Sequence, residues 1–246
     1  MQHEIEMGKY APLYEYLRAH DGLDEIEVTL EQVEAILGFA LPPRARPVKS
    51  EWWTMHPTSK QALSWIVAGR RPLRDEGRVV FVRAEARLGD TAERHRDGTE
   101  QYVAFARKEL DDGPPIVLDT AEQLRQWSPH EVYVIHFREA GLFKIGIAST
   151  GNGRPEDICR KAGALLLDRY EVANEWAAKV IEGEWLRQVR DVRVEPPLWV
   201  AQHAGVSEFW RDEVPAPSLR DYVLSLADDL ARPHWSISLP PSVWSR

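Results

Sequence analysis

The stretch that decides the fold reads Val132-Tyr133-Val134-Ile135-His136-Phe137 and, after a turn, Phe143-Lys144-Ile145-Gly146-Ile147. Both halves are short apolar runs with β-branched residues, and the turn Arg138-Glu139-Ala140-Gly141 contains a glycine. Such a pattern predicts a β-hairpin. Because side chains alternate along a strand, we expect Tyr133 and Ile135 on one face and His136 on the other.

Two helices and a third strand are predicted downstream of this hairpin. The Gly-rich loop 149–153 leads into a segment from Pro155 to Leu167 whose apolar residues have helical spacing, and proline suits the first turn of a helix. Residues 167–172 are typical of a strand. Asn174 is the expected N-cap of a further helix that runs to Val189. The predicted order is therefore strand, strand, helix, strand, helix.

Five short motifs follow one another along this part of the chain. They are Val132-Tyr133-Val134, Lys144-Ile145-Gly146, Arg154, Glu182 and Gly205-Val206-Ser207-Glu208-Phe209-Trp210. Together they resemble the GIY-YIG nuclease superfamily, in particular its viral-type branch, in which the second motif reads Lys-Ile-Gly. The last motif looks like the Gly-x-x-Glu-x-Phe segment that often closes the domain in this branch. The resemblance covers residues 131–210, roughly a third of the chain.

This resemblance implies a metal-dependent endonuclease that hydrolyses DNA, of the restriction or defence type. Tyr133 would accept or relay the proton of the attacking water, and Lys144 would lower the pKa of this phenol, which is about 10 when unperturbed. Arg154 would hold phosphate oxygens through its planar guanidinium, with Arg160 as the rival for this role. Glu182 would hold Mg²⁺ (or Mn²⁺), with waters completing the coordination.

Two departures from the family pattern keep a second hypothesis open. The first motif lacks the Gly that precedes Ile-Tyr, and no asparagine follows Asn174, although the family often has one after the glutamate. Gln188, Gln202 or Ser207 would have to replace it. The alternative is a catalytically inactive GIY-YIG-like protein that binds DNA or regulates. A third hypothesis, a protein-interaction role, rests on the acidic composition and the tryptophans of the C-terminal tail.

The composition of the 246 residues limits the class of protein. No apolar run approaches the roughly 18 residues of a membrane-spanning helix, so we expect no membrane association. The single cysteine, Cys159, cannot form an internal disulfide, which favours a cytoplasmic location. The net charge of −8 argues against a general affinity for DNA.

Positive charge is nevertheless concentrated in one region. From Arg44 to Arg83 the chain has nine Lys or Arg and three acidic residues, a balance of +6. A phosphate backbone contacts a local surface, so this region is the predicted DNA-binding part. The candidate phosphate contacts are Arg44, Arg46, Lys60, Arg70 and Arg71. Trp52, Trp53 and His56 are candidates for stacking on an exposed base, and core packing is the alternative for the tryptophans.

The N-terminal region is expected to form a small α/β domain. Helices are predicted at 10–20, 29–37 and 59–67 and strands at 25–28 and 78–82, with a turn at Arg70-Arg71-Pro72. Thr29 followed by Gln32 is a capping-box signature, and Gly38 is the expected helix end. Lys9-Tyr10, Leu41-Pro42, Trp52-Trp53 and Phe81-Val82-Arg83 give this region a resemblance to a small bacterial domain of unknown function that precedes nuclease domains. That likeness implies association with nucleic acid.

The predicted fold class is mixed α/β, of the α+β type. Its segments are a nucleic-acid-binding domain at 1–83, a partly helical linker at 84–129, a GIY-YIG-like domain with a short antiparallel sheet flanked by helices at 130–214, and a helical tail at 215–246. Cutting both strands of a palindromic site needs two active sites, so a homodimer on the duplex is a further expectation.

Overall fold

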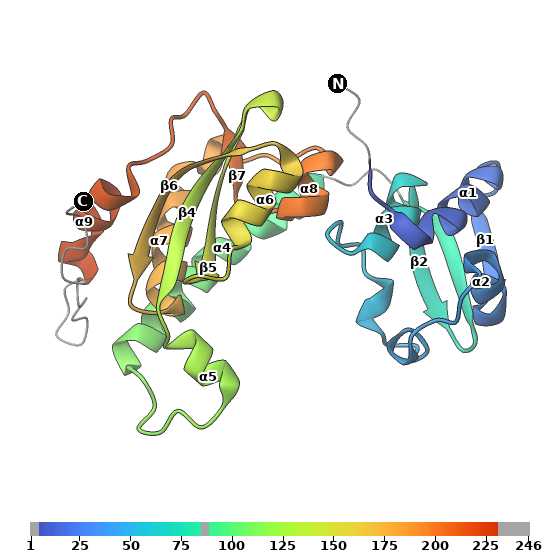
Figure 1. The fold of residues 1–246 in the computed structure, drawn as a ribbon, viewed down its shortest axis with the longest axis horizontal. Helices are drawn as coiled ribbons and strands as arrows, with labels where there is room; N and C mark the ends of the chain where they lie inside the picture. The colour runs from blue at the N-terminus through green and yellow to red at the C-terminus, as the bar shows by residue number, and fades with distance from the viewer. Residues whose placement is uncertain (1–4, 85–88, 231–246) are drawn as a thin grey trace. The chain divides into compact units, whose positions relative to one another are not determined.

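The computed structural model describes residues 5–84 and 89–230, with side chains except at 89–97 and 227–230. It combines helices with two antiparallel sheets, which confirms the α+β class. The chain forms two compact units (Figure 1): Met1–Leu88 with Pro197–Val206, and Gly89–Pro196 with Ser207–Arg246. None of the helices in the described part of the chain is both long and apolar enough to cross a bilayer.

The first unit contains a sheet in which β3 (Arg78–Arg83) lies between β1 (Glu25–Thr29) and β2 (Arg70–Asp75). Helices α1 (Ala11–Ala19), α2 (Leu30–Leu37) and α3 (Lys60–Val67) pack around a shared apolar core. The short 3₁₀ turns are η1 (Gly8–Tyr10), η2 (Pro43–Ala45) and η3 (Glu51–Trp53), and α8 (Leu198–Ala204) also belongs to this unit.

Local sequence signals set most of these boundaries. The capping box is confirmed: the Gln32 N–H donates to the Thr29 hydroxyl at 3.2 Å, and the Thr29 N–H donates to the Gln32 side chain at 2.7 Å. Gly38 ends α2 with a φ of 75°, as predicted. Strand β2 contradicts the turn predicted at Arg70-Arg71-Pro72. It is an edge strand, and Pro72 is tolerated there because an edge residue can lack an N–H without losing a ladder hydrogen bond.

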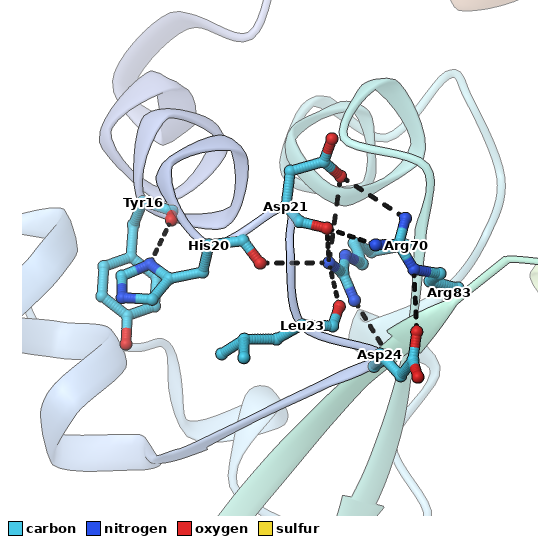
Figure 2. A network of polar contacts seen from close by, with 7 residues as sticks. All are labelled: Tyr16, His20, Asp21, Leu23, Asp24, Arg70 and Arg83. Atoms are coloured by element: carbon cyan, nitrogen blue, oxygen red, sulfur yellow. Dashed lines mark hydrogen bonds and ion pairs between the residues drawn. The ribbon is translucent and has the colours of Figure 1, made fainter.

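Arg70 is a structural residue of the first unit and has no access to DNA. Its side chain is 0% exposed. The guanidinium donates to the carbonyls of Leu23 at 2.7 Å, Asp24 at 3.0 Å, His20 at 3.3 Å and Asp21 at 3.4 Å (Figure 2). These carbonyls belong to the turn that follows α1. The predicted phosphate contact of Arg70 is therefore wrong, because its donors hold this turn against β2.

Trp52 and Trp53 are also core residues. They are 4% and 6% exposed, and their ring centroids lie 4.6 Å apart. Trp53 stacks on Trp65 at 5.5 Å, and Trp65 contacts Phe81 at 6.0 Å. The Trp53 indole N–H donates to the carbonyl of Ala45 at 2.9 Å. The prediction that these tryptophans stack on a base is wrong, because burying such large aromatic surfaces is what holds this small unit together.

The second unit is built on a four-stranded sheet of order β6-β4-β5-β7. The predicted hairpin is confirmed as β4 (His130–Phe137) and β5 (Leu142–Ser149), joined through η4 (Arg138–Ala140). β6 (Leu165–Val172) pairs with β4, and β7 (Phe209–Arg211) pairs with β5 from Leu142 to Lys144. All pairs are antiparallel.

The helices of the second unit cover both faces of this sheet. α6 (Arg154–Ala162) ends at Gly163, whose φ is 62°, so the helix predicted to reach Leu167 is too long and Leu165 begins β6. α7 (Glu175–Gln188) begins as predicted: the Asn174 side chain accepts the Ala177 N–H at 2.9 Å. η5 (Arg190–Val192) follows it.

Residues 84–129 do not act as a simple linker. α4 (Gly89–Asp112) packs along α7, and Arg107 bonds Glu184 at 2.8 Å. α5 (Ala121–Gln126) begins with a capping box at Thr120. α9 (Leu219–Leu230) confirms the helix of the tail, and its first residue is buried in the core of the second unit. Residues 85–88 of the predicted linker and 231–246 of the predicted tail lie outside the described residues.

Candidate active site

Tyr133 lies at the centre of the candidate site. It is 1% exposed and faces Gly146 across the β4–β5 pair. A Cβ atom on Gly146 would lie 2.6 Å from both Cζ and Oη of Tyr133. The tyrosine ring therefore lies directly over Gly146, and any side chain at residue 146 would displace it. This contact is the physical reason for glycine after Lys144-Ile145.

Lys144 lies on the same face of the sheet as Tyr133, because its partner in the register is Ile135. Its side chain is 2% exposed. The ammonium donates to Oε2 of Glu208 at 2.6 Å and to the carbonyl of Ser207 at 3.2 Å. It also lies 4.8 Å from the ring centroid of Phe209. A buried ammonium is thus held by one carboxylate, one carbonyl and one aromatic face.

Arg154 is the first residue of α6 and is exposed. Helix α6 lies over the Tyr133 face, because Glu156 of α6 pairs with Arg169, which is opposite Tyr133 on β6. Among the described ion pairs none involves Arg154, whereas Arg160 pairs with Asp157 of its own helix. The choice of Arg154 over Arg160 as the phosphate contact stays a prediction. It is favoured because, among the described ion pairs, the guanidinium of Arg160 is paired and that of Arg154 is not.

Glu182 lies in the middle of α7 and is 6% exposed. The Tyr102 hydroxyl of α4 donates to its carboxyl group at 3.2 Å. The next residue, Gly183, has no side chain, and a Cβ there would lie 2.2 Å from a Cγ atom of Val103. The close approach of α4 to α7 at Gly183 therefore brings Tyr102 onto Glu182. Glu184 instead pairs with Arg107 and Arg187, in line with the prediction that it points away from Glu182.

Helix α7 packs on the face of the sheet opposite to Tyr133 and Lys144, together with Val132, Val134 and Ile145. Glu182 nevertheless shares a cleft with the turn that precedes β7. The cleft has a volume of about 290 Å³, and its lining includes Thr99, Tyr102, Glu182, Arg193, Ser207 and Glu208. β7 begins at Phe209, which is opposite Lys144, so strand pairing along this side of β5 stops at Lys144. The cleft lies at this point, because Ser207 and Glu208 precede β7 directly. Glu182 therefore lies in one cleft with the turn that binds Lys144, and the charge of Lys144 lowers the pKa of Glu182.

The charges of the four predicted residues act on one another. Burial is the largest influence on Tyr133 and raises the pKa of its phenol; Lys144 and Arg154 lower it, and Glu182 and Glu208 raise it. The net pKa is above the ordinary value, so at neutral pH Tyr133 is a phenol and not a phenolate. Lys144 does lower the pKa of this phenol, as expected, but burial outweighs the ammonium and the net pKa is raised.

Burial and the neighbouring Glu208 raise the pKa of Glu182 to about 8. Lys144, the Tyr102 hydroxyl and Lys179 act in the opposite direction without compensating. Burial also raises the pKa of Glu208, but the adjacent Lys144 ammonium outweighs it and the net pKa is lowered. Of the two carboxyl groups, Glu208 is therefore the ionised one at neutral pH. Strongly shifted acids beside a buried cation are typical of functional sites.

Two residues of this cleft were not assigned a role from the sequence. Glu208 lies in the Gly-x-x-Glu-x-Phe segment, which carried the resemblance without a stated function. Tyr102 lies on α4, inside the segment predicted as a linker, and no local signal connects it with Glu182. His136, by contrast, is on the opposite face from Tyr133 as predicted, and it contacts Asp212 at 3.3 Å.

The oxygen donors of this cleft suit a hard divalent cation. Within residues 5–84 and 89–230 there is no group of three or more His, Cys, Asp or Glu side chains that could hold a metal. Mg²⁺, however, is commonly bound by one or two carboxylates and keeps several of its waters. Glu182, with waters completing the coordination, fits that pattern by ligand type, whereas the Glu208 carboxylate is bonded to Lys144. A cation would also offset the repulsion that raises the pKa of Glu182.

The remaining predicted DNA contacts lie on the surface of the first unit. Arg44 and Lys60 line a cleft of about 770 Å³ together with Lys49, and Glu51 is the acidic residue of its lining. Arg46 pairs with Glu34 at 2.6 Å. His56 contacts the Thr58 hydroxyl at 2.7 Å. Arg71 is exposed on β2.

Comparison of the chain with models of protein families, with curated proteins and with solved structures gives no match. The resemblance to GIY-YIG nucleases therefore rests on the sequence motifs.

Proposed function

We propose that the second unit is a metal-dependent endonuclease that hydrolyses DNA phosphodiester bonds, of the restriction or defence type. The observation that carries this proposal is geometric: Tyr133, Lys144 and helix α6, which begins at Arg154, lie on one face of the sheet. The turn that holds Lys144 lines a cleft together with Glu182. These residues are separated in sequence and come from two strands and two helices. Phosphodiester hydrolysis needs an activated water, neutralised phosphate charge and a stabilised leaving oxygen, and a phenol, two cations and a metal-binding carboxylate can supply them.

In this mechanism the oxygen of a water attacks phosphorus, and the bond to the leaving sugar oxygen breaks. Tyr133 is neutral at the start, so it would orient the water and relay the water's proton to solvent, while the leaving sugar oxygen takes up a proton from solvent. Arg154, at the exposed start of α6, holds the non-bridging phosphate oxygens. Lys144 adds positive charge beside the phenol. Mg²⁺ or Mn²⁺ held by Glu182 would stabilise the negative charge on the leaving oxygen.

The first unit would bind the DNA duplex. Its basic cleft has Arg44, Lys49 and Lys60 against Glu51, and such a surface attracts phosphate although the whole chain is acidic. A cut through both strands of a palindromic site would require two copies of the chain.

The test is cleavage of plasmid and phage DNA with Mg²⁺ or Mn²⁺. We expect Glu182→Ala to reduce the rate by at least about 100-fold. Glu184→Ala is the matched control, because it removes a carboxylate from the same helix outside this cleft, and it should cleave like the wild type. Equal cleavage by the wild type and Glu182→Ala on every substrate would contradict the proposal.

A second candidate function is DNA binding without cleavage. It is favoured by the basic cleft of the first unit, in which Arg44, Lys49 and Lys60 outnumber Glu51. It predicts salt-dependent retention of DNA with no nicked product at any metal concentration. A protein-interaction role would instead give no DNA retention even at low salt, where phosphate contacts are strongest.

A further inference from the structure

The turn formed by Ser207 and Glu208 has an unusual backbone. Glu208 has a φ of 66°, and among the described residues other than glycine it alone has a positive φ. This left-handed conformation is unfavourable for an L-residue with a long side chain, and glycine would adopt it without strain. Strained backbone of this kind is concentrated at functional sites, so the contacts that it permits indicate what it does.

This conformation directs three acceptors of the turn towards β5. The Glu208 carbonyl accepts the N–H of Ile145 at 3.2 Å. The Ser207 carbonyl and the Glu208 carboxylate accept from the Lys144 ammonium at 3.2 and 2.6 Å. The turn is therefore anchored to the residue after Lys144 while it holds Lys144 itself. A glycine at residue 208 would allow the backbone contacts but would remove the shortest bond to the ammonium.

We infer that Glu208 is a positioning residue, which fixes the Lys144 ammonium beside Tyr133 for the reaction. This inference rests on the proposed nuclease function and adds a residue to it. An ammonium has three donors, and Ser207 and Glu208 use two of them. These two bonds and the Phe209 ring fix where the ammonium lies, on the same face of the sheet as Tyr133. Without Glu208 the flexible lysine side chain would sample several rotamers, and a small misplacement of a catalytic group costs rate.

The kinetic test uses Glu208→Gln, which keeps the shape of the side chain and removes its charge. We expect kcat to fall by about 100-fold while KM changes by less than about 3-fold, because Glu208 orients a group and does not itself bind DNA. Glu208→Asp, which keeps a carboxylate, should recover at least about 10-fold of that loss. Asp212→Asn is the matched control: Asp212 follows β7 and pairs with His136, on the opposite face of the sheet. It should cleave like the wild type.

A measurement without DNA separates this inference from the proposed function. The rate at which an amine-reactive reagent modifies Lys144 is followed by mass spectrometry in the wild type and in Glu208→Gln. We expect modification to be at least about 5-fold faster in the variant, because the 2% exposed ammonium loses its carboxylate. Equal rates of modification, or a Glu208→Gln enzyme with wild-type kcat, would overturn the inference. If Lys144 is modified faster in Glu208→Gln than in the wild type but the wild-type protein cuts no DNA, the nuclease proposal is overturned. Glu208 would then hold Lys144 in a site that is not catalytic.

Discussion

Each unit buries one cation almost completely, and the two cations are treated differently. Arg70 in the first unit donates to four backbone carbonyls of one turn, and the carboxylate nearest to it, that of the 56% exposed Asp21, lies 3.9 Å away. Lys144 in the second unit bonds the Glu208 carboxylate directly, and its charge also acts on Glu182, whose pKa is raised to about 8. Backbone carbonyls that satisfy a buried arginine indicate a structural role. Carboxyl groups that compete for one ammonium indicate a site that is incomplete without a ligand.

The strongest test of this contrast is Arg70→Met. We expect a loss of about 4 kcal/mol in the free energy of unfolding of the first unit, since several buried carbonyls would lose their donor. Denaturant unfolding measures it. Arg71→Met, an exposed neighbour on the same strand, is the control and should change stability by less than about 0.5 kcal/mol. An Arg70→Met protein as stable as this control would contradict the structural role of Arg70.

Gly146→Ala tests the candidate active site of the second unit through the position of the Tyr133 ring. The added Cβ would lie 2.6 Å from the Tyr133 ring, so the ring must move. We expect about 3 kcal/mol of destabilisation from overpacking. Cleavage should be lost as well, because Tyr133 no longer faces the water. Gly22→Ala, where nothing lies within 4 Å of the added atom, should be neutral in thermal unfolding and in cleavage. A Gly146→Ala protein with unchanged cleavage would show that the position of Tyr133 is not critical.

Glu182→Gln tests the raised pKa of Glu182 in the second unit. Glu182 keeps its proton in the folded state up to a pH of about 8, whereas the unperturbed value is 4.5. The stability that this raised pKa provides is full below pH 4.5 and is lost as the pH rises through 8. Glutamine imitates the protonated acid, so without divalent metal the variant should be more stable than the wild type at pH 9, by about 2 kcal/mol, and similar to it at pH 4.5. Urea unfolding at several pH values measures this. A constant difference at all pH values would contradict the raised pKa.

The smallest expected effect concerns the basic cleft of the first unit. Arg44→Gln combined with Lys60→Gln should weaken DNA retention by about 10-fold and reduce the slope of log affinity against log salt by about 2. Arg71→Gln is the control, because Arg71 is exposed outside the lining of this cleft. A larger effect from Arg71 than from the pair would place the DNA contact on β2 instead.

Much of the local structure follows from short-range signals. The Asn174 cap, the Thr29 capping box and the glycine-containing hairpin turn depend on residues within a few positions of one another, and all three are confirmed. Errors occur where a distant contact decides. Leu165 and Leu166 fit a helix by spacing, but α6 ends at Gly163. Both leucines belong to β6, because they pair with β4. The helix α4 is polar enough to resemble a linker, and its packing on α7 is what makes it part of the second unit.

The sequence by itself determined the hairpin, the order of the motifs and the residue types that phosphodiester chemistry needs. Only the tertiary structure decided which charged and aromatic side chains are buried. Arg70, Trp52 and Trp53 lie inside the first unit, whereas Glu182 and Glu208 meet at the edge of β5. The physical reason is that burial and electrostatic interaction depend on distances between residues far apart in the chain. The identity of a basic or aromatic residue is the same in a core and on a surface, so only the packing of the folded chain shows whether that residue is buried or exposed.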